Sequence, residues 1–381
     1  MAALAFLMAA ASVTATPAHV RVDFDTRRVS RVTAVGLADR ATGRVLTAED
    51  PVRIASVSKL VVALGVMRLV EAGRLDLDRD VSHWLGWRVR HPAFPDAPVT
   101  LRQLLSHRAG LRDDVDYAIP LGGSVQATLG DPKAWAAGHA PGARFHYANL
   151  NFPVVASVME TATGERFDQL MARLVLDPLK LDACFNWTTC SDAAVARAVV
   201  LYGSDGSVRR DDLHGRRPDC PVLAAAECDL TGYVPGTNGA LFSPQGGLRV
   251  SARDLAAIGR VLLRPGKFLK PSSVAVLFAP VGTAGSGETE GGFYCRYGLA
   301  TQTLATPVEG CRDDPFGDGR ARVGHAGEAY GLRSGLWLDR RRGRGVAFFV
   351  TGVADDAPKG RSAFTVAEES VLSHAKPAID R

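Results

Sequence analysis

A long apolar segment near the N-terminus begins with a serine and carries a lysine one helical turn further on. Ser56 and Lys59 open this segment, and Val, Leu, Ala and Met dominate the residues that follow. The pattern predicts a strong helix over 56–72 that stops at Gly73. Because residues three apart share a helix face, the Ser56 hydroxyl and the Lys59 amine can touch.

This pair of side chains has the chemistry of an activated nucleophile. A serine hydroxyl is a weak nucleophile until a neighbouring base takes its proton, and a lysine held against apolar surroundings binds its own proton less tightly. Two plainer interpretations stay open. Ser56 could cap the helix, and Lys59 could lay its methylene stem along the surface with its amine in water.

The choice of lysine at this position favours the catalytic interpretation. Most of the 45 basic residues of the chain are arginine, yet the apolar segment contains Lys59. Arginine could not serve as a base, because a guanidinium does not lose its proton in proteins.

Size and charge restrict the classes of function. With 381 residues, 46% of them hydrophobic, the chain can build a large core with two lobes. The net charge of +5 is modest, and acidic residues are spread along the whole chain. We therefore expect no nucleic-acid partner.

The first residues predict export. Residues 2–11 are apolar and too short to span a bilayer, and small residues follow at 13–15, so residues 1–15 are expected to be a signal peptide. This leader lacks a basic residue before the apolar run, and a buried first helix is the alternative. No later segment reaches transmembrane length, so we expect a periplasmic or secreted protein without a membrane span.

Six cysteines are consistent with an oxidising compartment. They form couples that are close in sequence: Cys184 with Cys190, Cys220 with Cys228, and Cys295 with Cys311. An even count suits disulfides, but six cysteines allow many connectivities, and six separate buried thiols are the alternative. No C-x-x-C occurs, so zinc binding and thioredoxin-type chemistry are not expected.

Elements with β periodicity lie at both ends of the chain, and helices dominate its middle. Hairpins are expected over 29–46, with a turn at 39–43, and over 335–350. Helical segments are expected at 100–105, 151–174 with a break near 163–164, 251–263 and 362–375. Residues 184–245 are rich in Cys, Gly, Pro and Asp and are expected to be irregular.

This arrangement predicts an α+β (α/β) fold. The chain is expected to form an antiparallel sheet from both termini, flanked by helices, with a mostly helical lobe inserted. One domain would span 20–381, with a sheet lobe at about 20–75 and 245–381 and a helical lobe at about 76–244.

The order of several short motifs resembles the serine β-lactamase and penicillin-binding superfamily, in its class C branch. That branch includes class C β-lactamases, D-alanyl-D-alanine carboxypeptidases, D-aminopeptidases and β-lactamase-like carboxylesterases. Each motif is weak alone, but the set runs in order through most of the chain. The matching segments are 53–59, 99–111, 141–149, 177–179, 246–255 and 324–327.

The resemblance implies a role for each matching residue. Ser56 would form an acyl-enzyme, Lys59 would take or share its proton, and Tyr147 would relay protons to the leaving group and later to water. Asn149 would hold Lys59 or a substrate amide. The segment of His325, Ala326 and Gly327 would line the cleft. The backbone N–H groups of Ser56 and Glu328 would form the oxyanion hole, and a helix N-terminus at Ser56 favours negative charge there independently.

Structural interpretations of these residues stay open. Tyr147 could be a half-buried aromatic residue, Asn149 a turn residue and His325 a strand-edge histidine. His146 is interpreted as a neighbour of the site, and His107 as a residue that stabilises its turn.

The chain departs from the lactamase pattern at one motif. His325-Ala326-Gly327 stands where class C β-lactamases and many DD-peptidases carry Lys-Thr-Gly, whose lysine helps to bind the substrate carboxylate. Histidine is largely neutral at pH 7, and alanine lacks the hydroxyl. Arg333 could restore a cation, and Glu328 would disfavour anions if it points inward. Cephalosporins are therefore expected to be poor substrates.

Three functional hypotheses follow. The first is an exported serine hydrolase acting on esters or on D-amino-acid-containing peptides or amides; the others are a class C-like β-lactamase and a catalytically silent binding protein on the same scaffold. The absence of G-x-S-x-G and H-E-x-x-H disfavours an α/β-hydrolase and a metalloprotease. We expect a small-molecule or peptide substrate, no metal or other cofactor, and a monomer.

Overall fold

The fold is organised around one antiparallel sheet. The computed structural model describes residues 17–225 and 227–373, so the signal peptide expected at 1–15 lies outside the described residues. The sheet has six strands in the order β10-β11-β12-β13-β1-β2. Its strands are β1 His19–Asp25, β2 Val29–Val35, β10 Gln302–Thr303, β11 Val323–Ala329, β12 Leu332–Asp339 and β13 Arg344–Val350.

Strands from the two ends of the chain meet inside this sheet. β1 pairs with β13 over its whole length, with His19 opposite Val350 and Asp25 opposite Arg344. The expectation of a sheet assembled from both termini is thus confirmed. The hairpin expected at 335–350 is also confirmed, as β12 and β13. α10 (Val366–Leu372) packs on β13 and occupies part of the C-terminal segment for which a helix was expected.

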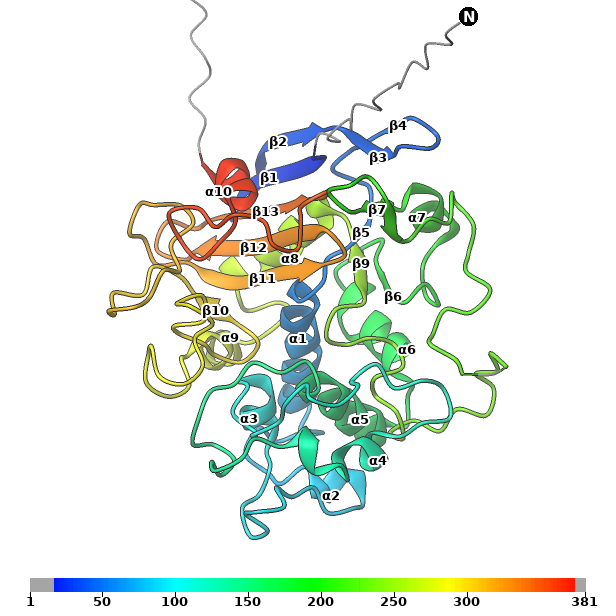
Figure 1. Cartoon of the computed structure of the whole chain (residues 1–381), viewed down its shortest axis with the longest axis vertical. Helices are drawn as coiled ribbons and strands as arrows, with labels where there is room; N and C mark the ends of the chain where they lie inside the picture. The colour runs from blue at the N-terminus through cyan, green and yellow to red at the C-terminus, as the bar shows by residue number, and fades with distance from the viewer. Residues whose placement is uncertain (1–16, 226, 374–381) are drawn as a thin grey trace, which may run out of the picture.

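Helix α8 (Ala252–Leu263) covers one face of the sheet and packs on β1, β12 and β13. Ser251, the first residue of the helical segment expected at 251–263, caps the helix by accepting a hydrogen bond from the Asp254 N–H. Gly259 allows the close approach, because a Cβ there would lie 2.4 Å from the Phe24 ring. Behind the sheet in Figure 1, α8 therefore sits tightly against the strands.

The helical lobe occupies the middle of the chain and forms the lower half of Figure 1. A capping box of Thr100 and Gln103 starts α3, and Gly164, at φ 74°, ends α5 at the expected interruption. The helices of this lobe are α2 Ser82–Leu85, α3 Leu101–Leu105, α4 Val125–Leu129, η1 Pro132–Ala134, α5 Asn151–Thr163, α6 Phe167–Met171 and η2 Ala172–Leu176. The lobe limits expected near 76 and 244 stay predictions.

Helix α1 (Val57–Glu71) runs between the sheet and the helical lobe (Figure 1). It has no solvent-facing polar side: most of its residues are buried, Lys59 among them. A helix that is apolar all round belongs inside a protein, which explains its central place. Its N-terminus points Ser56 at the junction of the two lobes.

The irregular segment expected at 184–245 contains few regular elements. They are β6 Cys184–Phe185, α7 Asp192–Arg197, β7 Leu201–Tyr202 and β8 Val208–Arg210. Disulfides join each couple of neighbouring cysteines and leave none of the six free. The alternative of separate thiols is therefore wrong, and each disulfide joins two cysteines that are close in sequence.

A second, smaller sheet has β9 Leu248–Val250 at its centre, between β6 and β5 Val52–Arg53. Helix α9, which follows later in the chain, is Pro271–Phe278.

The hairpin expected at 29–46 is wrong in its longer arm. The predicted turn does join two short strands, β3 Leu37–Asp39 and β4 Arg44–Val45, but β2 pairs with β1 instead. Gly36 separates β2 from β3 at φ 94°, and a Cβ there would lie 2.7 Å from the Ala18 Cβ. Alternation of apolar residues identifies strands, but it does not say which neighbour each strand takes.

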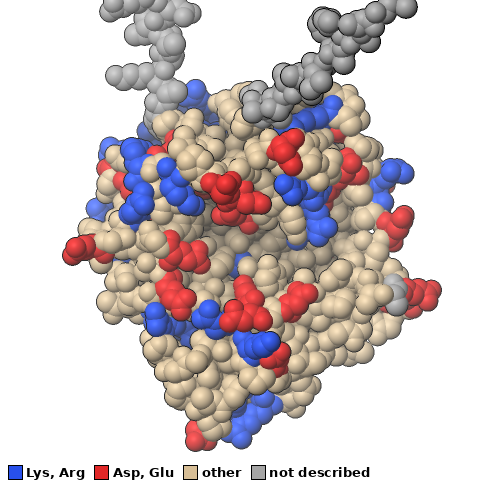
Figure 2. All heavy atoms as spheres, in the orientation of Figure 1, with Lys and Arg blue, Asp and Glu red and all other residues tan. Residues whose placement is uncertain are grey.

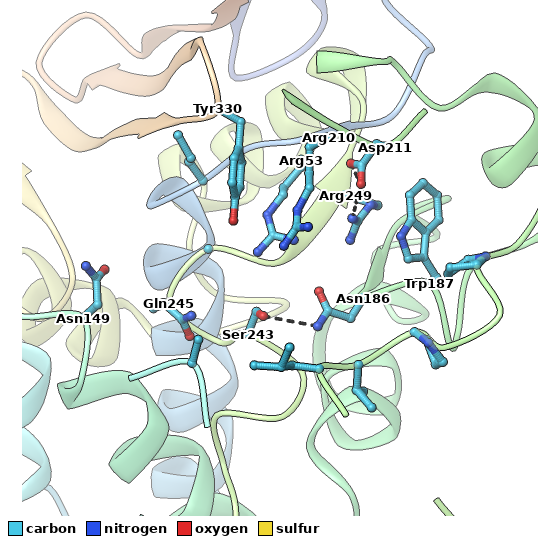
Figure 3. Close-up of a pocket in the computed structure, with 18 of the residues that line it drawn as sticks. Arg53, Asn149, Asn186, Trp187, Arg210, Asp211, Ser243, Gln245, Arg249 and Tyr330 are labelled. Atoms are coloured by element: carbon cyan, nitrogen blue, oxygen red, sulfur yellow. Dashed lines mark hydrogen bonds and ion pairs between the residues drawn. The ribbon is translucent and has the colours of Figure 1, made fainter. Parts of the chain in front are cut away.

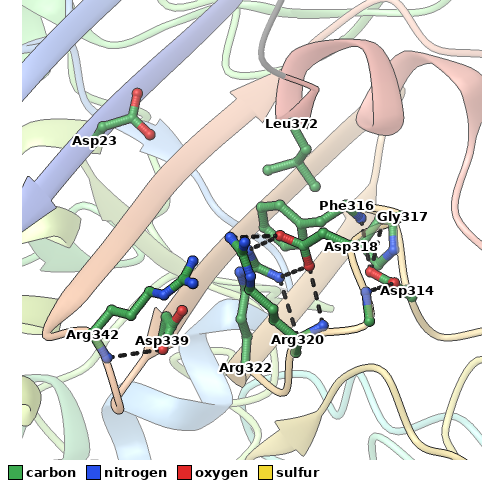
Figure 4. A network of polar contacts seen from close by, with 12 residues as sticks. Asp23, Asp314, Phe316, Gly317, Asp318, Arg320, Arg322, Asp339, Arg342 and Leu372 are labelled. Carbon is green, nitrogen blue, oxygen red and sulfur yellow. Dashed lines mark hydrogen bonds and ion pairs between the residues drawn. The ribbon is translucent and has the colours of Figure 1, made fainter.

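Charged side chains fix the loop that leads into β11 (Figure 4). Both carboxylate oxygens of Asp318 accept hydrogen bonds of 2.8 Å from the Arg322 guanidinium, which lies 3.7 Å from the centre of the Phe316 ring. Asp314 accepts hydrogen bonds from the N–H groups of Phe316, Gly317 and Gly319. In the part of the chain that the structure describes, no helix combines the length and the apolar character needed to cross a membrane.

Candidate active site

Ser56 lies at the N-terminus of α1, where the sheet and the helical lobe meet. Figure 2 shows this face hollowed near its centre, with acidic side chains above and below the hollow. The residue before it, Ala55, adopts φ 49°, a left-handed conformation that costs energy for a residue with a Cβ. Ser56 occupies the cap position, but its side chain makes no capping hydrogen bond. The hydroxyl is thus available for chemistry, and the interpretation of Ser56 as a simple helix cap is wrong.

Lys59 is fully buried, so the interpretation of a surface lysine is also wrong. Its Nζ lies 3.0 Å from Ser56 Oγ, 2.8 Å from Asn149 Oδ1 and 2.9 Å from the Gln245 carbonyl oxygen. Burial lowers the Lys59 pKa to about 7, although the charge of Asp113 opposes this shift. Near neutral pH, a large fraction of the protein therefore holds a neutral amine beside the Ser56 hydroxyl.

Asn149 holds Lys59 through its side-chain oxygen, and Asp113 fixes the orientation of that amide. One Asp113 oxygen accepts hydrogen bonds from the Asn149 backbone N–H (2.8 Å) and side-chain NH₂ (3.0 Å), and the other from the Leu150 N–H (2.9 Å). Sequence reasoning missed Asp113. The available signal was its position just after the 99–111 motif, but nothing local showed that it reaches residue 149.

Tyr147 is held between two rings close to the nucleophile. Its ring stacks on His107 at 4.2 Å and on Tyr294 at 4.6 Å between centroids. Its hydroxyl oxygen is buried and lies near the hydroxyls of Ser56 and Tyr294, although neither contact has hydrogen-bond geometry. Burial raises the pKa of Tyr147 more than these two neighbours lower it. The phenol is therefore protonated at neutral pH and has a proton to give.

The His325 imidazole is buried and lines neither of the cavities described below. It lies 2.7 Å from the Tyr297 hydroxyl through Nε2, and Nδ1 contacts the Ala326 carbonyl, so Nδ1 carries the proton and Nε2 accepts from Tyr297. Burial, followed by the charge of Lys59, lowers the pKa of His325 to about 3. The imidazole therefore supplies no cation to a substrate.

Gly327 allows β11 to approach the nucleophile. A Cβ at this position would lie 2.4 Å from Ser334 Oγ, 2.5 Å from the Ile54 carbonyl oxygen and 3.2 Å from the Ser56 backbone nitrogen. These contacts leave no room for a larger residue. Gly327 and Ala326 both line the cleft beside Ser56.

The β11–β12 hairpin directs one backbone N–H towards this cleft. Its two turn residues, Tyr330 and Gly331, have φ 55° and 74°, as in a type I′ turn. The residues that flank such a turn exchange hydrogen bonds, and the pairs alternate from there, so the Glu328 N–H points away from β12. On that side β10 pairs only with Val323 and Gly324. The Glu328 side chain bends to Arg333, 2.8 Å away, and stays largely exposed.

Two cavities flank Ser56 and share it with Asn149 and Glu328. The arginine cavity, of about 600 Å³, is lined by Arg53, Arg210 and Arg249 and is shown in Figure 3. The tyrosine cavity, of about 390 Å³, is lined by Tyr147 and Tyr294. Tyr147 does not line the arginine cavity.

The tyrosine cavity contains charges of both signs. Burial and the neighbouring acids raise the pKa of Glu290 to about 6, and burial raises that of Glu368. Arg312, Arg333 and Lys359 lie in the same wall. The loop around residue 290 was not expected from the sequence to contribute to the site. Within the described residues, no three His, Cys, Asp or Glu side chains gather so as to hold a metal ion.

Gly327→Ala is expected to impair both stability and activity. The added methyl group would overpack the contact between β11 and the start of α1, at a cost of about 1–3 kcal/mol in unfolding free energy. Because it also pushes the strand away from Ser56, we expect a loss of at least about tenfold in esterase kcat/KM. Thermal unfolding and p-nitrophenyl acetate turnover measure the two effects.

Gly232→Ala is the matched control for this substitution, since nothing lies within 4 Å of the Cβ that it would add. It should change neither quantity. Full esterase activity in the Gly327→Ala protein would contradict the close approach of β11 to Ser56.

Known proteins share this architecture and parts of this sequence. Esterase EstB of Burkholderia gladioli is 33% identical over 170 residues, which is 40% of this chain and 42% of EstB. The matched region thus spans less than half of that relative. Among solved structures, EstCE1, described as a hydrolase with promiscuous acyltransferase activity, superposes with a TM-score of 0.67 at 22% identity over 93% of both chains.

A second solved structure has the same fold. The D-amino acid amidase of Ochrobactrum anthropi SV3 superposes with a TM-score of 0.65 at 18% identity, over 93% of this chain and 92% of the amidase. The family model described as Beta-lactamase matches residues 11–368. The match runs through the sheet, the helical lobe and every residue around Ser56 described above. This chain belongs to the Beta-lactamase family.

Proposed function

We propose that this protein is an exported serine hydrolase that acts through an acyl-serine intermediate on esters or on D-amino-acid-containing peptides or amides. One observation carries the proposal: a fully buried Lys59 amine, with its pKa lowered to about 7, lies 3.0 Å from the Ser56 hydroxyl. A serine with such a base beside it is an activated nucleophile.

In the acylation step, Ser56 Oγ attacks the substrate carbonyl carbon as its proton passes to the neutral Lys59 amine. The carbonyl oxygen becomes an oxyanion, and the N–H groups of Ser56 and Glu328 stabilise it. When the tetrahedral intermediate collapses, the bond to the leaving group breaks and Tyr147 protonates the leaving oxygen or nitrogen. The Lys59 ammonium then gives its proton to the Tyr147 phenolate. The acyl-enzyme therefore forms with Lys59 as a neutral amine and Tyr147 as a phenol, as at the start.

Deacylation repeats these transfers with water as the nucleophile. The neutral Lys59 amine takes up a proton as water attacks the acyl-serine carbonyl, and the Tyr147 phenol relays it by accepting the water proton while passing its own proton to Lys59. When the tetrahedral intermediate collapses, the bond to Ser56 Oγ breaks and the Lys59 ammonium protonates that oxygen. Asn149 keeps the Lys59 amine in place during both steps, while Asp113 prevents its amide from turning.

Esters or amides fit the site better than β-lactams do. His325 is uncharged, Ala326 has no hydroxyl, and the cation of Arg333 already has Glu328 as its partner. The carboxylate of a cephalosporin would thus meet no free cation on β11 or on β12. The relatives support the same choice: EstB is named as an esterase, and the Ochrobactrum protein as a D-amino acid amidase.

Disulfide-rich loops support the exported setting. The three disulfides would be reduced in a cytosol, whereas they persist in an oxidising compartment. The apolar residues 2–11, which precede the fold, are a second support for export. A monomer remains our working proposal, although one protein of the same fold is described as an octameric penicillin-binding protein homologue from Pyrococcus abyssi.

Substrate panels test the proposed activity. We expect turnover of p-nitrophenyl esters of short acids or of D-amino acid amides, and a nitrocefin kcat/KM well below about 10⁶ M⁻¹s⁻¹, a value inside the ordinary enzyme range. We also expect a fluorescent fluorophosphonate to label Ser56. Nitrocefin turnover above that value would identify a β-lactamase instead, and a protein that is neither labelled nor active would be a binding protein on this scaffold.

A further inference from the structure

The two cavities beside Ser56 receive different parts of a substrate, if the proposed function holds. Tyr147, the group placed to protonate the leaving atom, lines only the tyrosine cavity. The leaving group therefore departs into that cavity. The acyl group, on the other side of the attacked carbon, then extends into the arginine cavity.

Three guanidinium groups converge on the arginine cavity. Arg53 on β5 and Arg249 on β9 are direct partners in an antiparallel pair, so their side chains point to the same face. Arg210 comes from β8. Figure 3 shows the guanidinium groups of Arg53 and Arg210 side by side, pointing into the cavity in the same direction as the Tyr330 hydroxyl. Both lie against the Tyr330 ring, at 5.4 and 5.0 Å from its centre.

The carboxylates around this cavity form an ion pair with Arg249 but make no ion-pair contact with Arg53 or Arg210. Asp211 binds Arg249 through both oxygens, at 2.6 and 3.2 Å. Glu328 turns to Arg333, and Asp116 at the exposed rim accepts a hydrogen bond from the Ala118 N–H. Across the described residues, neither Arg53 nor Arg210 has an ion pair or a side-chain hydrogen bond.

Such an arrangement is costly unless an anion enters. Arg53 is only 8% exposed, and its Nε is buried without a partner. Burial and the Arg249 charge lower the Arg53 pKa to about 10, so the group is still charged at neutral pH. A buried cation with no anionic partner opposes folding, and the like charges of Arg53 and Arg249, which are opposed on neighbouring strands, add to that cost. A planar fork of N–H donors fits a carboxylate well.

We propose that Arg53 and Arg210 form an acyl-group subsite that binds a carboxylate, so that the preferred substrates carry an acid at the far end of the acyl chain. The proposal rests on the proposed hydrolase function. It names the class of acyl group, which neither the family nor the relatives specify for this chain. The Tyr330 ring and hydroxyl complete the wall against which that carboxylate lies.

A matched pair of esters tests this subsite. Mono-4-nitrophenyl adipate ends its acyl chain in a carboxylate, whereas 4-nitrophenyl hexanoate ends a chain of the same length in a methyl group. We expect kcat/KM to favour the adipate by about tenfold or more, in keeping with a hydrogen-bonded charge pair. The preference should weaken as salt is raised, because screening acts on the charged ester alone.

Variants of the arginines locate the effect. Arg53→Gln and Arg210→Gln should each lower the ratio of adipate to hexanoate kcat/KM by about tenfold. Arg210 is exposed, so its variant tests the subsite even if Arg53→Gln fails to fold. Arg209→Gln is the control: its side chain is next in sequence, pairs with Asp205 and does not line the cavity. It should keep the wild-type ratio.

Calorimetry separates this proposal from the proposed function. Monomethyl adipate is titrated into Ser56→Ala protein with and without Arg53→Gln, so that no turnover is needed. Binding that weakens by about tenfold in the double variant would support the subsite even if no ester were hydrolysed. Equal handling of both esters, or a ratio unchanged in both arginine variants, would overturn the subsite while leaving the hydrolase intact.

Discussion

Ser56→Ala protein is expected to show no measurable turnover of p-nitrophenyl esters. The substitution removes the hydroxyl that lies 3.0 Å from the Lys59 amine, so no acyl-enzyme can form. Removing the nucleophile of a serine hydrolase lowers kcat by on the order of 10⁶. Initial rates with p-nitrophenyl acetate measure the loss, and mass spectrometry after fluorophosphonate treatment shows whether the covalent label has gone.

Ser58→Ala is the matched control on the same helix. Ser58 is buried, and its hydroxyl accepts a hydrogen bond from the Leu248 N–H at 3.1 Å, but it lines neither cavity. This variant should lose about 1–2 kcal/mol of unfolding free energy and keep its activity. Turnover retained in Ser56→Ala, or lost equally in both variants, would show that the nucleophile lies elsewhere.

Lys59→Met is expected to lower esterase kcat/KM by about 10³-fold, within the range of a positioned general base. Methionine fills a similar volume without a base. Lys59→Arg should lose as much, because a guanidinium keeps its proton. Rates that match the wild type in either variant would exclude Lys59 as the base.

The pH profile reports the same group in the unmodified protein. The neutral amine is the active form, so kcat/KM should fall about tenfold for each pH unit below the Lys59 pKa of about 7 and level off above it. His325 cannot cause this limb, because its pKa is lowered to about 3. Glu290, with a pKa raised to about 6, is the nearest competitor. A Glu290→Gln variant should therefore keep the limb near pH 7, and a limb that moves or disappears would assign it to Glu290.

Stability should respond to the same titration with a defined sign. An unfolded chain keeps a proton on Lys59 up to about pH 10.5, whereas the native protein releases it from about pH 7. Between these values the unfolded state binds more protons, so the contribution of this group to unfolding free energy rises with pH. At neutral pH the buried lysine opposes folding, which is the kind of cost that catalytic sites retain.

Much of the fold could be predicted from the sequence because its signals are local. The Ser251 cap of α8, the Thr100 capping box, the end of α5 at Gly164 and the β12–β13 hairpin each depend on a few neighbouring residues. The pairing partner of each strand was harder to predict from the sequence. The wrong arm of the 29–46 hairpin shows that the alternation of β2 could not reveal its pairing with β1.

The candidate site divides in the same way. Ser56 and Lys59 lie one turn apart on one helix, so their contact follows from helix geometry, and Tyr147 and Asn149 were found by motif order. Asp113, Glu290 and the arginine cavity were missed, because those residues meet only when loops and strands distant in sequence pack together.

The amino-acid sequence by itself determined which groups could react: a hydroxyl and an amine at helical spacing in an apolar segment. The tertiary structure decided how they react. The removal of water from around Lys59 lowers its pKa, and the packing of β5, β8 and β9 gathers arginines beside the nucleophile. Desolvation and long-range electrostatics depend on every neighbour in space, and no local pattern of residues encodes them.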